Sequence, residues 1–398
     1  MRSHACKDGS PGERPRMRHS GPSMDQTIVA GAAEIAARAE RELEALVGVS
    51  TPSGDIAGAE EAIAICAALL PVQASVQRPE SSTPGCAPDL LAVMHGRGRS
   101  RLLLLGHVDT VFPHTSHAPL RRQGERLYGP GGADMKGGVT LALGLARFLA
   151  HRPELFAELA VLLVTDEEWR TSEFAHVRRF EGYDACLCFE AGERTDGAEG
   201  VIVRRKAAGS LRVTATGRAA HSGSAPDKGR NALLALARAA LEVSELHDPH
   251  GSERLSVVPT VFRSGETLNI VPAAGELLFD IRADHLGAFA PVLEAVPIDH
   301  AGVKLSSTLL RQWPGMDTRA GTEAVITRAA ARIARPIAGT DRGGASDASH
   351  FAVSIPLTID GLGPRGGGAH TSAEFVLTPS LRERSEVALA IALEILNG

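Results

Sequence analysis

The stretch LLLLGHVD, residues 102–109, is an apolar run that ends in an imidazole and a carboxylate. Two further runs, AVLLVTDEE at 160–168 and ACLCFE at 185–190, end in carboxylates. Such runs are typical of buried parallel strands, and sites in open α/β sheets form beyond the carboxyl ends of those strands. We therefore expect the terminal side chains to meet at one edge of a sheet. They are His107, Asp109, Glu167, Glu168 and Glu190.

Composition narrows the class of partner. The chain has 398 residues and is 43% hydrophobic, which is enough for two or three domains with sizeable cores. With 42 basic and 47 acidic residues, its formal net charge of −5 provides no field that would gather nucleic acid or anionic lipid. No apolar stretch approaches the roughly 20 residues that span a bilayer. A small soluble substrate fits best, with neither nucleic acid nor membrane as a partner.

The cysteines and the N-terminus indicate a compartment. Five cysteines without CxxC spacing argue against a disulfide framework and a thiolate zinc site, so a cytoplasmic location is expected. Residues 1–24 are polar, basic and rich in glycine and proline, without the apolar core of a signal peptide. We expect a disordered leader there.

Residues 25–203 alternate helical and strand patterns. Apolar spacing predicts helices from about Asp25 to Ser50, over 57–70 and over 137–152. Strand candidates at 72–77 and 89–94 precede the stretch at 102–109. Because residues 312–398 return to the same alternation, both parts are expected to form one α/β domain with a mixed, largely parallel sheet flanked by helices.

Residues 204–311 have a different order of predicted helices and strands, which indicates an insertion. Their order of elements, β-α-β-β-α-β, predicts a ferredoxin-like α+β unit with an antiparallel sheet and helices on one face. The predicted elements are 210–217, 230–246, 255–265, 275–284, 285–296 and 302–307.

The spacing of ligand-type residues points to metal chemistry. Zn²⁺ accepts imidazole nitrogen and carboxylate oxygen, and one carboxylate can bridge two ions. Two ions about 3.5–4 Å apart lower the pKa of a shared water and polarise a carbonyl. The candidate ligands are His107, Asp134, Glu168, Glu190 and His370. Five ligands suit two ions that share one carboxylate, so a metal-dependent hydrolase is predicted.

Two further carboxylates have predicted roles beside these ligands. Glu167 is next to Glu168, so it is placed to take a proton from the attacking water and return it to the leaving amine. Asp109 lies two residues after His107, where it can accept the other imidazole N–H and fix the tautomer.

Five motifs occur in an order that resembles the co-catalytic zinc metallopeptidase family, which includes glutamate carboxypeptidases, succinyl-diaminopimelate desuccinylases, acetylornithine deacetylases and aminoacylases. The motifs are GHVDTVFP at 106–113, YGPGGADMKGG at 128–138, TDEE at 165–168, FEAGE at 189–193 and HTSAEF at 370–375. The resemblance covers nearly everything after residue 40 and implies the zinc exopeptidase type of fold.

The resemblance also implies how the site is divided. His107 and Glu190 would bind one zinc, Glu168 and His370 the other, and Asp134 would bridge them. Co²⁺ or Mn²⁺ could replace Zn²⁺. Glu167 is similar to the general base of the family and Asp109 to its orienting carboxylate. A cis peptide bond between Asp134 and Met135 is also implied.

The insertion resembles the lid, or dimerisation, domain of the family, which implies a homodimer. His221 lies where these enzymes have a histidine that approaches the scissile carbonyl, often in the partner's site. Asn269 and Arg282 match residues that bind the free carboxylate of the substrate, and Gly343 and Gly344 belong to a glycine-rich loop that closes the pocket. From the residues alone, Arg282 could equally form an ordinary salt bridge, and Asn269 could be a turn residue.

The expected activity is hydrolysis of an amide bond next to a free carboxylate in a small peptide or N-acyl-amino acid. NIVP at 269–272, Arg282 and the segment 200–217 resemble the glutamate carboxypeptidase branch most. Two alternatives stay open. The first is an N-acyl-amino-acid deacylase, a deacetylase or desuccinylase, with the same site; the second is a metal-binding homologue without catalysis.

Overall fold

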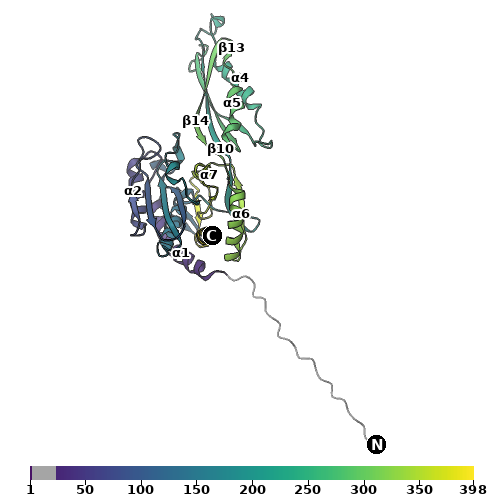
Figure 1. Cartoon of the computed structure of the whole chain (residues 1–398). Helices are drawn as coiled ribbons and strands as arrows, with labels where there is room; N and C mark the ends of the chain where they lie inside the picture. Colours follow the sequence, from purple (N-terminus) through teal and green to yellow (C-terminus); the bar gives the residue numbers. More distant parts are fainter. Residues whose placement is uncertain (2–23) are drawn as a thin grey trace.

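The computed structural model describes Met1 and residues 24–398, so the predicted leader falls almost wholly outside the described residues. The chain forms two parts (Figure 1). One part holds α1, α2, α6 and α7 together with the C-terminus, and the other is an elongated layer of strands with α4 and α5 that extends away from it. The functional residues can therefore lie in either part or at the junction between the two parts.

The larger part is built on a six-stranded sheet in the order β1-β2-β6-β3-β7-β17. The strands from β6 to β17 run parallel, whereas β1 and β2 form an antiparallel edge. This arrangement confirms the expected mixed, largely parallel sheet. Its strands are β1 (Ser75–Gln77), β2 (Leu90–His95), β3 (Ser100–His107), β6 (Phe156–Val164), β7 (Ala185–Cys188) and β17 (Thr358–Ile359).

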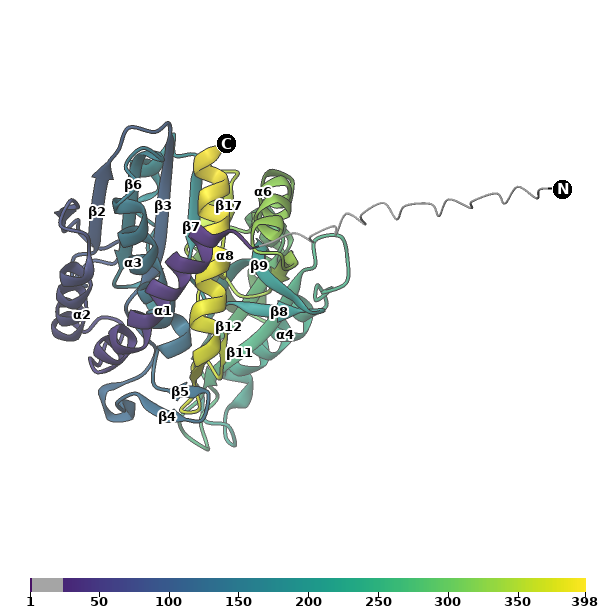
Figure 2. The same cartoon turned by 90° about the horizontal axis from the view of Figure 1, so that it is seen from below.

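Both faces of this sheet are buried, which explains why its strands are continuous apolar runs. Leu102 and Leu104 belong to a core with the helices on one face, whereas Leu103 and Leu105 pack on the other face with aromatic residues such as Phe351. Burial of each leucine contributes roughly 1.5–3 kcal/mol. The helices of the first face are α1 (Gln26–Val47), α2 (Ile56–Leu69), α3 (Gly137–Ala150) and α8 (Thr378–Asn397), and Figure 2 shows α1 and α8 crossing in front of the strands.

In α1, the local sequence determines both the buried face of the helix and the residue at which it begins. Its buried face repeats at three- and four-residue spacing, through Ile28, Ala32, Ile35, Ala39, Leu43 and Leu46. The Asp25 side chain accepts a hydrogen bond from Thr27 N–H at 2.9 Å and so caps the helix. Because Asp25 also pairs with Arg332 at 2.7 Å, the start of α1 is fixed to α6.

The larger part also contains a smaller sheet, and one strand of this sheet was not predicted from the sequence. β16 (Ile337–Arg342) pairs in parallel with β9 (Ala198–Arg205), although its sequence IAGTDR lacks alternation of apolar residues. The remaining elements of this part are β4 (Arg121–Gln123), β5 (Arg126–Tyr128), β8 (Glu193–Thr195), β15 (Met316–Asp317), β18 (Gly366–Gly367), β19 (Phe375–Leu377), α6 (Arg319–Arg332) and α7 (Ala348–Ala352).

The elongated part is an antiparallel sheet in the order β11-β12-β10-β14-β13, with a core of its own. The predicted helix 285–296 is shorter than expected, because a 3-10 turn over Leu286–Phe289 precedes α5 and Pro291 occupies its start. The elements are β10 (Ala207–Thr216), α4 (Ala232–Ser244), β11 (Ser256–Ser264), β12 (Ala274–Ala283), α5 (Ala290–Glu294), β13 (Asp299–His300) and β14 (Val303–Trp313). The role of this sheet as a lid or dimerisation domain stays a prediction.

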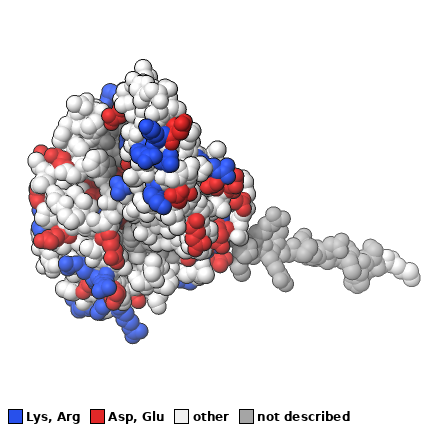
Figure 3. Space-filling model, turned by 90° about the horizontal axis from the view of Figure 1, so that it is seen from above, with Lys and Arg blue, Asp and Glu red and all other residues white. Residues whose placement is uncertain are grey.

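Two surface properties bear on partners. Acidic and basic side chains are interspersed on the face seen in Figure 3. Among the residues that the structure describes, no helix combines the length and apolar character needed to cross a bilayer.

Candidate active site

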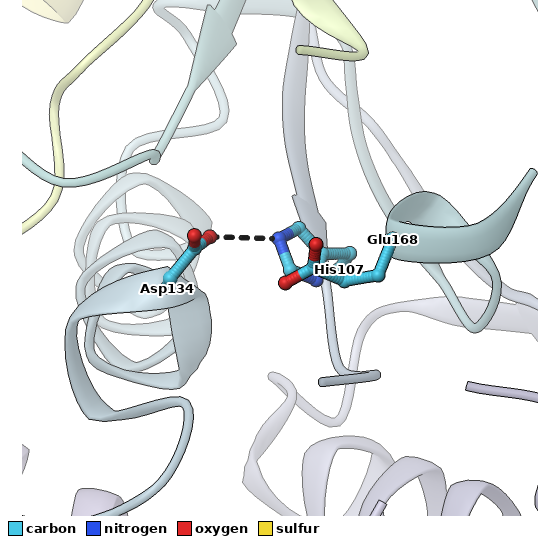
Figure 4. A group of neighbouring side chains, drawn as sticks. All are labelled: His107, Asp134 and Glu168. Atoms are coloured by element: carbon cyan, nitrogen blue, oxygen red, sulfur yellow. Dashed lines mark hydrogen bonds and ion pairs between the residues drawn. The ribbon is translucent and has the colours of Figure 1, made fainter. Parts of the chain in front are cut away.

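The predicted ligands come together from distant parts of the chain. His107 is the last residue of β3, and Glu168 lies in a 3-10 turn, Glu167–Trp169, that begins shortly after the end of β6 at Val164. Asp134 lies in a short π-helix, Gly132–Lys136, at the start of α3. Figure 4 shows the side chains of His107, Asp134 and Glu168 pointing toward one another, and one ligand atom from each lies within 4.8 Å of the others.

The carboxylate of Asp134 lies between two imidazoles. Its Oδ1 is 3.3 Å from Nε2 of His107, and its Oδ2 is 3.2 Å from Nε2 of His370. Each imidazole faces a second carboxylate as well: Glu190 is 3.6 Å from His107, and Glu168 is 3.2 Å from His370. The cluster therefore consists of two His–carboxylate pairs joined by one aspartate.

This cluster attracts positive charge. The neighbouring carboxylates of Asp134 and Glu168 raise the pKa of His370 to about 10. Burial would lower the pKa of His107, but hydrogen bonds to Asp109 and Asp134 raise it well above its usual value. The carboxylates thus favour the charged form of both imidazoles, and a divalent cation would provide this positive charge instead.

The donor atoms are also chemically suited to bind a metal ion. Glu168 Oε1 is buried and has no hydrogen-bond partner among the described residues, although Nε2 of His370 lies nearby. A buried oxygen of this kind is costly unless a cation or a donor satisfies it. Imidazole nitrogen and carboxylate oxygen are the ligands that Zn²⁺ accepts in hydrolytic sites.

Asp109 is buried behind His107 and links it to the Glu167 turn. Its carboxylate lies 3.3 Å from Nδ1 of His107 and accepts hydrogen bonds at 3.1 Å from the backbone N–H groups of Glu167 and Glu168. The Ser53 hydroxyl donates a further hydrogen bond at 2.6 Å. One aspartate thus holds both the histidine and the turn, as an orienting group requires.

The loop before Asp134 is fixed by a glutamate that the sequence reasoning had not assigned. The carboxylate of Glu374 accepts hydrogen bonds from the N–H groups of Gly131, Ala133 and Asp134 at 2.8–2.9 Å. Gly131 has a φ of 68°, a left-handed conformation that favours glycine. The Asp134–Met135 peptide bond is cis, as the resemblance implied.

A cavity of about 250 Å³ opens between this cluster and the five-stranded sheet. Glu167 lies in its wall, and burial raises the pKa of this carboxyl well above its usual value, with Asp347 and Glu168 adding to the effect. The other lining residues are Asp134, Glu168, Glu190, Ala208, Gly209, Ser210, Asp280, Arg282, Arg311, Gly344, Ala345 and His370. The cavity thus joins the carboxyl group of Glu167, several of the predicted metal ligands and two guanidinium groups.

The structure does not bring every predicted residue to this cavity. His221 and Asn269 neighbour each other, since Ser222 N–H donates to the Asn269 carbonyl, but neither lines it. His221 comes after β10 and Asn269 before β12, next to the end of the sheet where Thr216 pairs with Ala274, whereas Ala208 at the other end lines the cavity. The eight residue steps of β10 from Ala208 to Thr216 extend about 26 Å.

The remaining predicted residues are placed as follows. Gly344 lines the cavity, but Gly343 does not. Arg282 lines the cavity, although its guanidinium forms a bidentate pair with Asp280 at 2.9–3.1 Å. Arg311 lines the cavity as well, and sequence reasoning missed it because nothing in its local pattern separates it from a surface arginine.

Together, the fold and the site define a class of protein. A parallel α/β sheet whose strand ends present histidine and carboxylate around a bridging aspartate is the arrangement of a metal-dependent hydrolase. The sequence profile of peptidase family M20/M25/M40 matches residues 103–394. The chain belongs to this family, and it is therefore a hydrolase with a metallopeptidase-type site.

Individual relatives support the same assignment. Carboxypeptidase G2 of Pseudomonas sp. (strain RS-16) is 28% identical over 376 residues, which are 90% of this chain and 89% of that protein. Succinyl-diaminopimelate desuccinylase of Stenotrophomonas maltophilia (strain R551-3) is 31% identical over 319 residues, 74% of this chain and 83% of that protein. The crystal structure of aminopeptidase PepT from Bacillus cereus has a TM-score of 0.74 at 20% identity and covers 90% of this chain and 98% of that one, so it supports the fold.

Proposed function

We propose that the chain is a two-zinc carboxypeptidase that cleaves an amide bond next to a free carboxylate. The observation that carries this proposal is the position of Asp134, whose two carboxylate oxygens face the two imidazoles His107 and His370. Glu190 and Glu168 would complete the two metal positions. Zn²⁺ is the proposed ion, with Co²⁺ or Mn²⁺ as substitutes that accept the same donors.

In this proposal the side chains of the cavity have separate roles. Two divalent ions held there would lower the pKa of water and polarise the substrate carbonyl. Glu167 would take a proton from the attacking water and pass it to the leaving nitrogen, since its raised pKa suits both steps. Asp109 would keep His107 in one tautomer and hold the Glu167 turn in position.

The proposed division into domains places the cavity at a junction. Residues 25–203 and 312–398 would form the catalytic domain, and residues 204–311 the lid and dimerisation domain. His221 lies far along the sheet from Ala208, so His221 of the partner subunit would have to reach the site in a homodimer. Asn269 of the partner subunit would reach the site in the same way, because Asn269 neighbours His221.

Exposed apolar side chains on this part suit contact with a second copy. β11 is an edge strand of its sheet, and its Phe262 is 46% exposed. On α4, Leu234 is 59% and Leu241 is 66% exposed. Unpaired edge strands and exposed apolar patches are features of protein interfaces.

A deacylase is the second candidate. The desuccinylase of S. maltophilia has the higher identity of the two relatives above, and the same cluster would serve removal of an acyl group from an amino acid. Both activities act on small substrates. We place the protein in the cytoplasm, because the described cysteines, Cys66, Cys86, Cys186 and Cys188, are free.

The two candidates are separated by hydrolysis of matched substrates. The panel contains N-acyl-L-glutamates and dipeptides with a C-terminal glutamate on one side, and N-acetyl- and N-succinyl-amino acids on the other. Release of a C-terminal amino acid with higher kcat/KM supports the carboxypeptidase, and preference for the acyl set supports the deacylase. Fewer than two zinc ions per chain at full activity would contradict the dinuclear site. A metal-loaded protein that hydrolyses neither set would favour the non-catalytic homologue, which would not need a proton acceptor such as Glu167.

A further inference from the structure

The cavity lies between two parts of the chain, so its shape depends on how these parts are held together. Its carboxylate side belongs to the larger part, whereas Asp280 and Arg311 belong to the five-stranded sheet. Within residues 24–398 the chain passes between the two parts twice, at Lys206 between β9 and β10 and at residues 314–315 between β14 and β15. Short connections of this kind are where hinges absorb changes in backbone angles. Contacts beside them therefore decide how the sheet faces the metal-type ligands.

Four charged side chains form a closed ring beside the two connections. Arg254, in the loop before β11, and Asp284, directly after β12, belong to the elongated part. Arg204 on β9 and Asp341 on β16 belong to the larger part. Asp284 binds Arg254 at 2.6 Å through Oδ1 and Arg204 at 2.7 Å through Oδ2. Oδ2 of Asp341 lies 3.3 Å from Arg204 and 3.4 Å from Arg254. Positive and negative charges thus alternate around the ring, and two of its four contacts join the two parts.

The backbone beside the ring is also closely packed. Arg254 has a φ of 48°, a left-handed conformation that is uncommon for residues other than glycine and persists where the surroundings enforce it. Lys206, the single residue between β9 and β10, donates a hydrogen bond at 2.6 Å from Nζ to the Arg254 carbonyl. At the second connection, a Cβ added to Gly315 would lie 2.0 Å from the carbonyl oxygen of Asp284. Both connections therefore contact residues of the ring directly.

The ring differs from an isolated surface ion pair. Isolated exposed pairs contribute little to stability, whereas charges that share partners in a network can hold a defined geometry. Arg204 and Asp284 are only 20% and 19% exposed, so their contact is partly shielded from water. Asp317, 3.9 Å from Arg204, extends the network at its edge. Because each guanidinium of the ring contacts both carboxylates, the loss of one arginine breaks two contacts at once.

We propose that this ring positions the five-stranded sheet against the metal-type ligands and thereby sets the width of the cavity. Asp280, in the cavity wall, precedes Asp284 by four residues, about 13 Å along a strand. A rotation of about 10° around the ring would therefore move this wall by about 2 Å. A misplacement of about 1 Å can lower the rate of an enzyme about 100-fold. The inference rests on the proposed function, and it assigns the four side chains as positioning residues that touch no substrate.

The first test follows the two connections without substrate. Hydrogen–deuterium exchange is measured by mass spectrometry on the full-length protein with zinc added, in peptides that cover residues 203–208 and 313–317. Arg254→Met is expected to raise exchange in both peptides about 10-fold, because the connections open more often. Arg263→Met is the control: it removes an exposed ion pair with Glu276 inside the five-stranded sheet and should change neither peptide. Equal exchange in Arg254→Met and the wild type would overturn the proposal.

The second test follows the cavity through hydrolysis of N-acyl-L-glutamates. Arg254→Met should lower kcat/KM about 10-fold, and Arg254→Lys, which keeps the charge, should recover most of it. The effects of Arg254→Met and Asp341→Asn should not add in the double variant, since both open the same ring. Sodium chloride screens partly exposed charges, so an increase from about 0.05 to about 0.5 M should lower kcat/KM severalfold more in the wild type than in Arg254→Met.

The two tests separate this inference from the proposed function. If the wild type hydrolyses no substrate, the proposed function fails, and the exchange measurement alone decides whether the ring holds the two parts. If exchange rises in Arg254→Met while kcat/KM and its salt dependence stay those of the wild type, the ring does not shape the cavity and the inference is wrong.

Discussion

Glu374 holds the backbone of Asp134: its Oε1 accepts the Asp134 N–H at 2.9 Å, while the same carboxylate binds two further N–H groups of the loop. A glutamine in its place would direct an amide NH₂ at one of these donors. We expect Glu374→Gln to weaken zinc binding by about 10–100-fold, as changes behind a ligand typically do. Competition with a chromogenic chelator measures this affinity. Glu323→Gln, at an exposed glutamate of α6, should leave the affinity unchanged, and an unchanged affinity in Glu374→Gln would contradict the role.

Part of the site could be predicted because it depends on local sequence. His107 ends one apolar strand and Glu168 lies in the turn after another, so the fold of the sheet alone brings them to one edge. The contribution of Asp134 depends on a turn whose glycine pattern is visible in the sequence, and His370 was found through its motif.

The rest of the site depends on pairing between distant strands. Whether Arg282 is free depends on the position of Asp280, and the side to which Arg311 points depends on a bulge in a register that no local pattern specifies. β16 was missed for a related reason, since its strand conformation comes from pairing with β9 and not from its own alternation of residues. The distance of His221 from the cavity likewise follows from strand length and direction.

Glu167 is expected to be needed for turnover and not for metal binding. Its carboxyl group lines the cavity. We expect Glu167→Gln to lower kcat by about 10²–10⁴-fold, the usual contribution of a general acid–base group. Zinc content by atomic emission should remain that of the wild type. Glu173→Gln, in the exposed segment that follows, is the control; full activity in Glu167→Gln would exclude its role in proton transfer.

A buried arginine should stabilise the loops around the cavity. Arg170 pairs with Asp166 at 2.7 Å and with Asp347, and all three side chains are buried. Removing one member of such a group leaves uncompensated buried charge, so Arg170→Met should lower the free energy of unfolding by about 3–5 kcal/mol. Urea denaturation measures the loss. Arg319→Met breaks an exposed pair with Asp317 and should have little effect. Equal effects of the two variants would show that burial of the Arg170 group adds nothing to the free energy of unfolding.

The pH dependence of stability should include a contribution from His350. Burial lowers the pKa of this imidazole to about 4, and the neighbouring Arg170 and Arg311 add to the effect. Between pH 6.5 and 4 the unfolded chain binds a proton at this position that the folded chain does not, so stability falls as the pH falls through this window and is fully present above it. The change amounts to at most about 3 kcal/mol.

His350→Phe removes this titration, and phenylalanine suits a position packed against Trp313. We expect the free energy of unfolding of the variant to decline less between pH 6.5 and 4 than that of the wild type, in urea titrations of EDTA-treated protein. His250→Phe, at an exposed histidine that forms no ion pair among the described residues, is the control for replacement of a histidine elsewhere. Parallel curves for His350→Phe and the wild type would mean that His350 is protonated equally in both states.

Whether two copies share each site can be decided by mixing two inactive proteins. His221→Ala lacks the histidine that we expect to reach the partner's cavity, and Glu167→Gln lacks the proton acceptor in its own. In a mixed dimer, the site with an intact Glu167 would receive His221 from the Glu167→Gln subunit. Co-expression should therefore restore about a quarter of the wild-type activity, since about half of randomly assembled dimers are mixed and each has one complete site. If His221 instead acted within its own chain, no arrangement of the two variants would hold a complete site, and the activity of the mixture would stay at the level of its parents.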